Sequence, residues 1–413
     1  MLKKIRVILA AIFFAAITLL FLDFTGVMPR YFGWMAKIQF LPAVLAINVG
    51  VVVGLVIFTL LFGRVYCSVI CPMGVFQDII ARIGNRFKKN KKRPYSWSAE
   101  KKWIRYGVLG LFILAIILGA GAIVALLAPY SSYGRIASSF FQPVYRLGNN
   151  LFASLSAHMG NYAFYSVDVW IKSLSTFIIA AVTLVVIVIL AARGGRTYCN
   201  TICPVGTALS FFSRFAMFRP VIDPDKCKNC RQCEFKCKAS CINIKEHKID
   251  YSRCVDCFNC LDNCKFGALK YKFAYAKKGA EPSTNEAVPS QSDKGRRAFM
   301  AGTAIALGMA TLKAQEKKVD GGLATIIDRK KPTRQQPITP PGSGSFKQMY
   351  NHCTGCQLCV SACPNDVLRP SSDLMRLMQP EASYERGYCR PECTRCSEVC
   401  PAGAILPIDA MGA

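Results

Sequence analysis

The sequence is poor in histidine and lacks several common cofactor-binding motifs. Its 413 residues include only three histidines, His158, His247 and His352, and none belongs to a CxxCH motif for haem c attachment. None lies within a long apolar run, so a pair of axial haem ligands inside a membrane is not expected. The sequence also has no glycine-rich phosphate-binding loop and no segment that resembles a flavin attachment site. These absences exclude the familiar haem and nucleotide motifs.

Acidic residues are also scarce. There are 24 of them against 52 lysines and arginines, which gives a formal net charge of +28 at pH 7. Such an excess can indicate nucleic-acid binding, but much of it flanks apolar runs, where lysine and arginine set the orientation of membrane helices. We therefore expect no nucleic-acid partner. Docking of an acidic redox partner is an additional hypothesis.

Four long apolar runs dominate the first half of the chain. They extend over Val7–Val27, Leu41–Phe62, Ile104–Ala128 and Thr176–Ala192. Each approaches or exceeds the roughly 20 residues that cross the hydrocarbon core of a bilayer. Basic residues precede the first run and crowd the loop after the second, so the positive-inside rule predicts a cytoplasmic N-terminus. We expect a multi-pass protein of the bacterial inner (cytoplasmic) membrane.

An internal repeat follows the second and the fourth apolar runs. Residues 63–74 read GRVYCSVICPMG, and residues 195–206 read GRTYCNTICPVG. The matched spacing indicates two helix pairs related by duplication.

Each copy of the repeat carries a CxxxCP motif, which we expect at the inner membrane edge. In a helix, cysteines four residues apart share one face. Two such pairs could supply four thiolates to one cluster or metal ion, act as redox dithiols, or mark a structural turn. The four cysteines are Cys67, Cys71, Cys199 and Cys203.

Most of the 21 cysteines fall into four further groups. Two groups have C-x2-C-x2-C-x3-C spacing: Cys227, Cys230, Cys233, Cys237 and then Cys254, Cys257, Cys260, Cys264. Two more follow near the C-terminus, the last with a wider first gap: Cys353, Cys356, Cys359, Cys363 and then Cys389, Cys393, Cys396, Cys400. Such dense groups indicate metal ligation rather than disulfides. Zinc sites usually combine two CxxC pairs separated by a longer loop, so the spacing favours [4Fe–4S] clusters.

The spacing resembles the bacterial two-cluster ferredoxin, in which the fourth cysteine of each motif ligates the other cluster. The resemblance implies four clusters with these ligand sets: Cys227, Cys230, Cys233, Cys264; Cys254, Cys257, Cys260, Cys237; Cys353, Cys356, Cys359, Cys400; and Cys389, Cys393, Cys396, Cys363. Lys238 and Lys265 stand where the family usually has proline, and a nearby cation should raise the cluster potential modestly. Cys241 is left over, and we expect it to be a small buried residue.

The predicted fold is a four-helix membrane unit of two duplicated helix pairs, followed by two α+β ferredoxin-like domains. The predicted order is the membrane domain (1–220), a first ferredoxin domain (221–275), a linker (276–293), a short apolar segment (294–314), a second linker (315–345) and a second ferredoxin domain (346–413). Arg296-Arg297 resembles a twin-arginine export signal, which would carry the second domain into the periplasm and leave the first in the cytoplasm. The alternative is an ordinary basic linker.

The apolar runs, the twin CxxxCP motifs and the first ferredoxin domain together resemble the NapH-type membrane quinol dehydrogenases, which are related to NosR-type and CcoG-type proteins. The tail from about Lys294 resembles the partner ferredoxin NapG, so the chain looks like a fusion of the two. The resemblance implies electron flow from the quinone pool through the clusters to a periplasmic reductase. No catalytic side chain is predicted; candidate quinol contacts are Arg30, Tyr31, Trp34, Tyr130 and Arg135.

Two other functions fit the same sequence. One is a maturation or regulatory membrane protein that supports another oxidoreductase. The other is a carrier that delivers electrons from a cytoplasmic donor to quinone.

Overall fold

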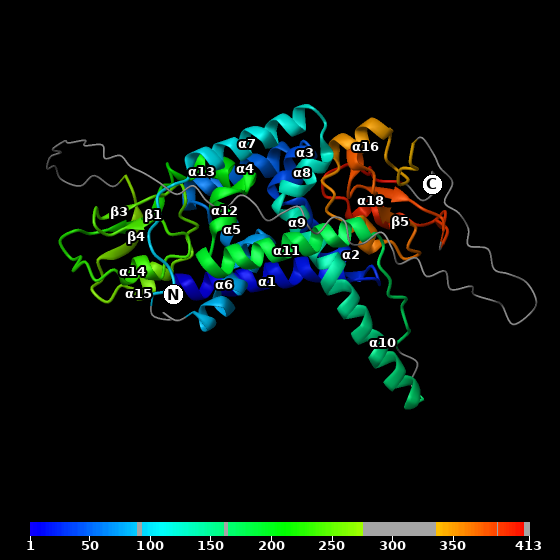
Figure 1. Ribbon diagram of the computed structural model, residues 1–413, viewed down its shortest axis with the longest axis horizontal. Coiled ribbons are helices and arrows are strands. Elements are labelled where there is room, and N and C mark those ends of the chain that lie inside the picture. Colours follow the sequence, from blue (N-terminus) through cyan, green and yellow to red (C-terminus); the bar gives the residue numbers. More distant parts are fainter. Residues whose placement is uncertain (89–92, 161–163, 276–335, 386, 409–413) are drawn as a thin grey trace, which may run out of the picture. The chain divides into compact units, whose positions relative to one another are not determined.

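The computed structural model describes residues 1–88, 93–160, 164–275, 336–385 and 387–408. These residues form a single unit that contains the helical region and both cysteine-rich regions (Figure 1). The predicted linker 276–293, the twin-arginine-like segment 294–314 and most of the linker 315–345 lie outside the described residues.

Among the described residues, two helices are long and apolar enough to cross a membrane. They are α1 (Leu2–Leu22) and α11 (Leu174–Gly194), with 21 residues each. At about 1.5 Å per residue, each is about 30 Å long, which matches a bilayer core. The apolar helix α4 (Val49–Phe62) has 14 residues and α7 (Lys102–Ile117) has 16. The four-helix membrane unit therefore stays a prediction.

The second and third apolar runs are each broken into two helices. The second run contains α3 (Phe40–Leu45) and α4, and the third contains α7 and α8 (Gly121–Leu127). Asn48 caps α4 by accepting a hydrogen bond from the Val51 N–H at 3.3 Å, and Gly119 has a φ of 69°. The expectation of continuous spans was wrong because apolar composition alone does not reveal a polar cap or a glycine turn.

The other helices of this region complete one bundle. α6 packs against α1 and α11, and α13 packs against α4 and α7. The bounds are α2 (Val27–Lys37), α5 (Val65–Val69), α6 (Pro72–Phe87), α9 (Pro129–Ile136), a π-helical turn η1 (Ala137–Phe141), α10 (Gln142–His158), α12 (Thr197–Thr201) and α13 (Pro204–Ser213).

Both cysteine-rich regions are small α+β domains. The first ferredoxin domain contains β1 (Phe218–Ile222) paired antiparallel with β4 (Leu269–Phe273), β2 (Ile242–Asn243) paired with β3 (Lys248–Ile249), α14 (Gln232–Phe235) and α15 (Asn259–Asn263). The second contains α16 (Phe346–His352), α17 (Leu358–Ala362), β5 (Leu368–Pro370) paired with β6 (Pro380–Ala382), the 3₁₀ turn η2 (Leu374–Arg376) and α18 (Arg395–Val399).

Helix α1 touches the two ferredoxin domains at its opposite ends. Near its start, Lys3 forms an ion pair with Asp262 of the first domain at 2.8 Å. Just after its end, the carbonyl oxygen of Phe24 accepts a hydrogen bond from Arg395 of the second domain at 3.3 Å. The two domains therefore contact the same helix about 30 Å apart along its axis.

The other main helices repeat this arrangement. Before α11, Lys172 pairs with Asp366 of the second domain, and after it the Arg196 N–H donates to the carbonyl oxygen of Lys238 in the first. The segments around α4 and α7 make equivalent contacts at both ends, between Leu45 and His352, Arg64 and Asp256, Arg105 and Ser252, and Gly121 and Gln379. The helices thus run between the two ferredoxin domains.

Candidate iron–sulfur centres

The four CxxxCP cysteines lie together in the core of the helical bundle. Cys67, Cys71, Cys199 and Cys203 are each at most 5% exposed and belong to one buried cluster. Their thiols are close enough to interact electrostatically with one another. The chain turns at glycines with positive φ after α4 and α11, and both motifs are buried within the bundle. Their expected position at the membrane edge stays a prediction.

Each CxxxCP motif spans a break between two helices. Cys199 lies in α12, whereas Cys203 is the residue before α13. Pro204 occupies the first position of α13, where a missing N–H costs nothing, and proline would disrupt a helix interior. The expectation that both cysteines share one helical face is therefore wrong. Instead, the Gly206 N–H donates to the sulfur of Cys203 at 3.3 Å, and helix N-terminal N–H groups favour a thiolate.

Two buried arginines join the copies of the repeat reciprocally. Arg64 of the first copy donates to the carbonyl oxygen of Cys199 at 3.2 Å. Arg196 of the second copy donates to the carbonyl oxygen of Cys67 at 2.6 Å. Each copy therefore fixes the backbone that carries the first cysteine of the other.

Each copy of the repeat ends in a glycine because the backbone makes a close contact there. A Cβ atom on Gly74 would lie 2.1 Å from the carbonyl oxygen of Cys67, and one on Gly206 would lie 2.5 Å from that of Cys199. No side chain fits at these distances. The repeat therefore needs glycine at both positions to bring the cysteine-bearing segments against the next helix.

A short chain of contacts leads from the core cysteines to the first ferredoxin domain. The backbone N–H of Arg64 donates to Asp256 at 3.0 Å, and the sulfur of Cys254 lies 3.6 Å from the other carboxylate oxygen. Burial raises the pKa of Asp256 to about 7, although the hydrogen bond from the Arg64 backbone N–H opposes the rise. Cys254 is a predicted cluster ligand, so Arg64 and Asp256 connect it with Cys199.

On the other side, buried side chains lead toward the second ferredoxin domain. Tyr198 adjoins Cys199 in sequence, and Arg135 interacts electrostatically with both Tyr198 and Cys356. A Cβ atom on Gly134 would lie 2.3 Å from the carbonyl oxygen of Cys356, so α9 packs directly on that cysteine-bearing loop.

The structure groups the ferredoxin cysteines in the sets that the resemblance implies. Three small cavities are lined by Cys227, Cys230, Cys233 and Cys264, by Cys237, Cys254, Cys257 and Cys260 together with Cys241, and by Cys363, Cys389, Cys393 and Cys396. Cys353 interacts electrostatically with Cys356 and Cys400, and Cys359 with all three. Each set combines three cysteines of one motif with one of the other. Cluster binding by these sets stays a prediction.

No three histidine, cysteine or acidic side chains among the described residues meet closely enough to bind a single metal ion. The ligands of a cubane bind different iron atoms, so they do not have to converge on one point. The all-thiolate donor sets fit a [4Fe–4S] cluster.

Cys241 is buried, as the sequence predicted, but it also touches a predicted ligand. Its sulfur lies 3.5 Å from that of Cys237. The hydrogen bond from Cys241 lowers the pKa of Cys237 to about 7. Sequence reasoning missed this contact because Cys241 belongs to no motif.

Lys238 has a role that the motif comparison did not suggest. Its ammonium group lies 3.4 Å from Asp78 of α6, which also pairs with Arg6 and Arg196. The first ferredoxin domain is therefore attached to the bundle through a buried carboxylate. Lys265, at the equivalent position of the second motif, is exposed.

The five candidate quinol contacts do not form one site. Arg30, Tyr31 and Trp34 are exposed on α2. Tyr130 and Arg135 are buried, at 2% and 0% exposed, beside the second ferredoxin domain. A cavity of about 210 Å³ between the start of α11 and the second ferredoxin domain is lined by none of them.

Three family models match parts of the chain, and all three describe 4Fe-4S domains. A 4Fe-4S binding domain family matches residues 45–92 and 176–221, which include both CxxxCP motifs. Two 4Fe-4S dicluster domain families match residues 250–367 and 352–406. No solved structure matches the chain.

Several curated proteins are weakly similar. The putative electron transport protein YccM of Escherichia coli is 24% identical over 228 residues, which cover 54% of this chain and 55% of that protein. The methylamine utilization ferredoxin-type protein MauN of Methylobacillus flagellatus is 24% identical over 236 residues, covering 55% of this chain and 69% of its own. An uncharacterised protein of Methanocaldococcus jannaschii is 25% identical over 282 residues, covering 67% of this chain and 97% of its own.

These similarities and the cysteine sets define the class. The chain contains ferredoxin-type 4Fe-4S domains beside a helical region with two helices that could span a membrane. It is an iron–sulfur electron-transfer protein.

Proposed function

We propose that the chain is a membrane-bound electron carrier of NapH type that takes electrons from quinol and passes them to a periplasmic redox partner. Four clusters would be held by the ferredoxin cysteines and a fifth by Cys67, Cys71, Cys199 and Cys203. Oxidation of one quinol yields a quinone, two protons and two electrons, and oxidised [4Fe–4S] clusters accept such electrons one at a time.

The observation that carries the proposal is the burial of the four CxxxCP cysteines between the two ferredoxin domains. They touch the first domain through Arg64 and Asp256 and approach the second through Tyr198 and Arg135. Without a cluster at these cysteines, no predicted redox group would lie between the two ferredoxin domains. A cluster there would let electrons cross the helical bundle without a haem group.

The side chains around the core cysteines suit a bound cluster. The guanidinium group of Arg64 lies 3.9 Å from the sulfur of Cys67, and Gln77 donates to the sulfur of Cys199 at 3.2 Å. Hydrogen bonds to sulfur stabilise the thiolate form and raise a cluster's reduction potential. These residues position the ligands and compensate their charge.

The periplasmic assignment rests on the arrangement of the helices and on the charge pattern. Each main helix contacts one ferredoxin domain at each end, and the basic N-terminus lies at the end of the first domain. The positive-inside rule then supports a cytoplasmic first domain and a periplasmic second domain. Alkaline phosphatase fused after Ala413 should be active in intact cells; an inactive fusion, with a stable protein, contradicts this assignment.

Iron content and quinol-dependent reduction test the core site. Anaerobically purified full-length protein should hold about 20 iron atoms, whereas four ferredoxin clusters alone require about 16. The double variant Cys67→Ser/Cys199→Ser should lose about four irons and keep the ferredoxin EPR signals. Cys241→Ser, at the one cysteine outside the motifs, should keep all of them. Equal iron content in the double variant and the wild type would refute the core cluster.

A second candidate function is electron transfer in the opposite direction, from a cytoplasmic donor to quinone. The same contacts between the first ferredoxin domain and the core cysteines favour it. In that case a reduced low-potential dye, added from the cytoplasmic side of proteoliposomes, would reduce quinone faster than quinol reduces the clusters. The forward proposal expects rapid cluster reduction by a short-tailed menaquinol or ubiquinol, followed by EPR. Failure of both quinols to reduce any cluster removes the quinol assignment.

A further inference from the structure

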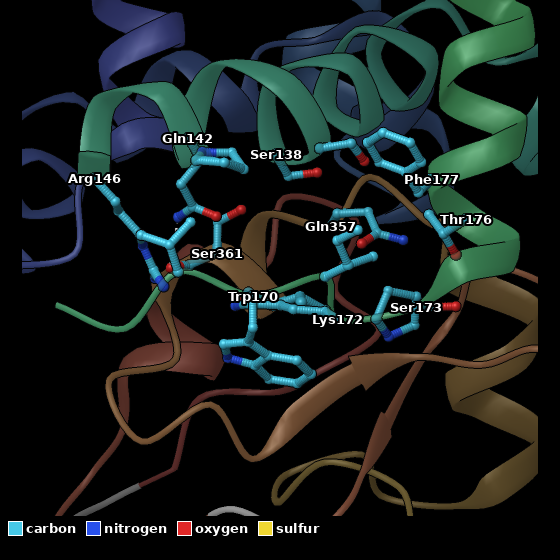
Figure 2. A pocket seen from close by; sticks show the side chains of 16 residues that line it. Ser138, Gln142, Arg146, Trp170, Lys172, Ser173, Thr176, Phe177, Gln357 and Ser361 are labelled. Carbon is cyan, nitrogen blue, oxygen red and sulfur yellow. Dashed lines mark hydrogen bonds between the residues drawn. The ribbon is translucent and has the colours of Figure 1, made fainter. Parts of the chain in front are cut away.

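A cavity of about 210 Å³ lies where η1, α10, the start of α11 and the second ferredoxin domain meet (Figure 2). Small-molecule pockets usually measure about 300–1,000 Å³, so this one suits a single ring rather than a nucleotide. Much of its wall is apolar and includes Ile171, Phe177 and Val360.

Two hydroxyl groups in the wall have no hydrogen-bond partner among the described residues. They belong to Thr176 and Ser361, which are 2% and 1% exposed. Leaving a buried hydroxyl unpaired is unfavourable, so both groups call for a ligand that hydrogen-bonds. Figure 2 shows Thr176 on α11 and Ser361 on the opposite side of the cavity. A para-quinone carries its two oxygens on opposite edges of one ring, where each can accept from a hydroxyl; a quinol can donate instead.

The two cations of the wall, Arg146 and Lys172, share one carboxylate beside it. Asp366 binds Lys172 at 2.9 Å and lies 3.9 Å from Arg146. Burial raises the pKa of Asp366, but the two cations outweigh it and hold that pKa below its usual value. The two cations carry one positive charge more than the carboxylate, and the Nε–H of Arg146 has no hydrogen-bond partner among the described residues. This side of the cavity therefore favours a ligand oxygen that accepts a hydrogen bond.

The position of the cavity also suits a lipid-soluble ring. Val144 and Leu174, which follow the wall residues Pro143 and Ser173 in sequence, are 68% and 63% exposed, so apolar side chains reach the surface close to the wall residues along the chain. The π-helical turn η1 supplies Ser138 to the wall, and such turns are frequent at functional sites.

The cavity wall includes part of a predicted cluster-binding loop. Gln357, Val360 and Ser361 line it, and they lie between the predicted ligands Cys356 and Cys363. A ring bound here would contact the segment that carries those ligands.

From these observations we propose that the cavity binds the head group of a quinone or quinol, with Thr176 and Ser361 as the hydrogen-bonding residues. The choice of quinone rests on the proposed function, whereas the two unpaired hydroxyls and the apolar wall are independent of it. This site replaces the residues that sequence analysis suggested on α2 and α9.

Binding of a fluorescent quinol analogue tests the site without relying on electron transfer. Full-length protein with its clusters, in lipid nanodiscs, is titrated with 2-heptyl-4-hydroxyquinoline N-oxide, and the quenching of that probe is measured. Thr176→Val and Ser361→Ala should each weaken binding roughly fivefold, because each removes one hydrogen bond of about 1 kcal/mol. Ubiquinone-1 or menadione should displace the probe from the wild type.

Thr183→Val is the matched control. It makes the same substitution on α11, where the Thr183 hydroxyl donates to the carbonyl oxygen of Ile179 at 2.7 Å. It should bind like the wild type, and all variants should keep their iron content and melting temperature. Where a single variant fails to fold, the other hydroxyl variant still decides the question.

The results of this experiment distinguish quinone binding in the cavity from the proposed quinol-oxidising function. If Thr176→Val and Ser361→Ala bind the probe like the wild type, the cavity is not the quinone site, even if quinol still reduces the clusters. If both weaken binding but quinol reduces no cluster in the wild type, the site stands and the quinol-dehydrogenase function fails.

Discussion

The side chain of Arg64 donates a hydrogen bond to the carbonyl oxygen of Cys199, which lies 135 residues later in the other copy of the repeat. Arg196 returns the interaction to Cys67. Each copy therefore donates an arginine hydrogen bond to the other, and neither cysteine segment is held by its own copy alone. The duplication seen in the sequence has become one site with approximate twofold symmetry.

This exchange predicts equal effects for two distant substitutions. Arg64→Met and Arg196→Met should each lower the free energy of unfolding by about 3 kcal/mol or more, because each leaves buried polar partners unsatisfied. Each should also reduce the iron content toward that of the ferredoxin domains alone. Thermal unfolding and iron analysis of purified protein measure both effects.

Arg82→Met supplies the control, since Arg82 is exposed on α6. It should keep both the melting temperature and the iron content. A large loss for Arg64→Met with none for Arg196→Met would contradict the reciprocal arrangement.

The glycines of the repeat give a second prediction. Gly74→Ala and Gly206→Ala should each destabilise the protein by at least about 2 kcal/mol, because the added methyl group would overlap a carbonyl oxygen. Gly54→Ala, in α4, meets no atom within 4 Å and should be neutral or slightly stabilising. Melting temperatures in one detergent compare the three variants. An equally stable Gly74→Ala would show that this close approach does not exist in solution.

Short spacings within a loop indicate three cysteines of each ferredoxin set, whereas the fourth, from the other motif, follows only from the resemblance to two-cluster ferredoxins. The structure brings these cysteines close together, and their binding of clusters stays a prediction. The sequence did not predict the geometry of the CxxxCP motifs. The i, i+4 rule assumes a continuous helix, whereas Pro72 and Pro204 begin new helices immediately after the second cysteine. The proline in the motif was the available signal for this break.

Contacts between distant segments could not be read from the sequence. Asp78 lies in an amphipathic stretch where a single acidic residue carries no pattern, yet it pairs with cations from three separate segments. The cavity is likewise built from three segments of the chain, so the quinol contacts guessed from interfacial aromatic residues fell elsewhere.

The ion pairs of Asp78 predict stability losses of different size for three substitutions. Asp78→Asn leaves three cations without a buried counter-charge and should cost about 3–5 kcal/mol. Lys238→Met should cost less, about 1–2 kcal/mol, because Asp78 keeps two arginine partners. Lys265→Met, at the equivalent exposed position, should change stability by less than about 0.5 kcal/mol. Thermal unfolding gives the order, and equal losses for the two lysine variants would mean that Lys238 does not hold the first domain to the bundle.

Cys241 gives a prediction about potential rather than stability. A ligand bound to iron carries no proton, so Cys241 has to be the donor in its contact with Cys237, 3.5 Å away. Hydrogen bonds to ligand sulfur raise the reduction potential because they stabilise the more negative, reduced cluster. Cys241→Ala should therefore lower the potential of one cluster by about 40 mV, which corresponds to about 1 kcal/mol for one electron. Cys241→Ser keeps a donor and should shift it less. EPR-monitored redox titration resolves the change; a variant that loses iron instead would identify Cys241 as a ligand.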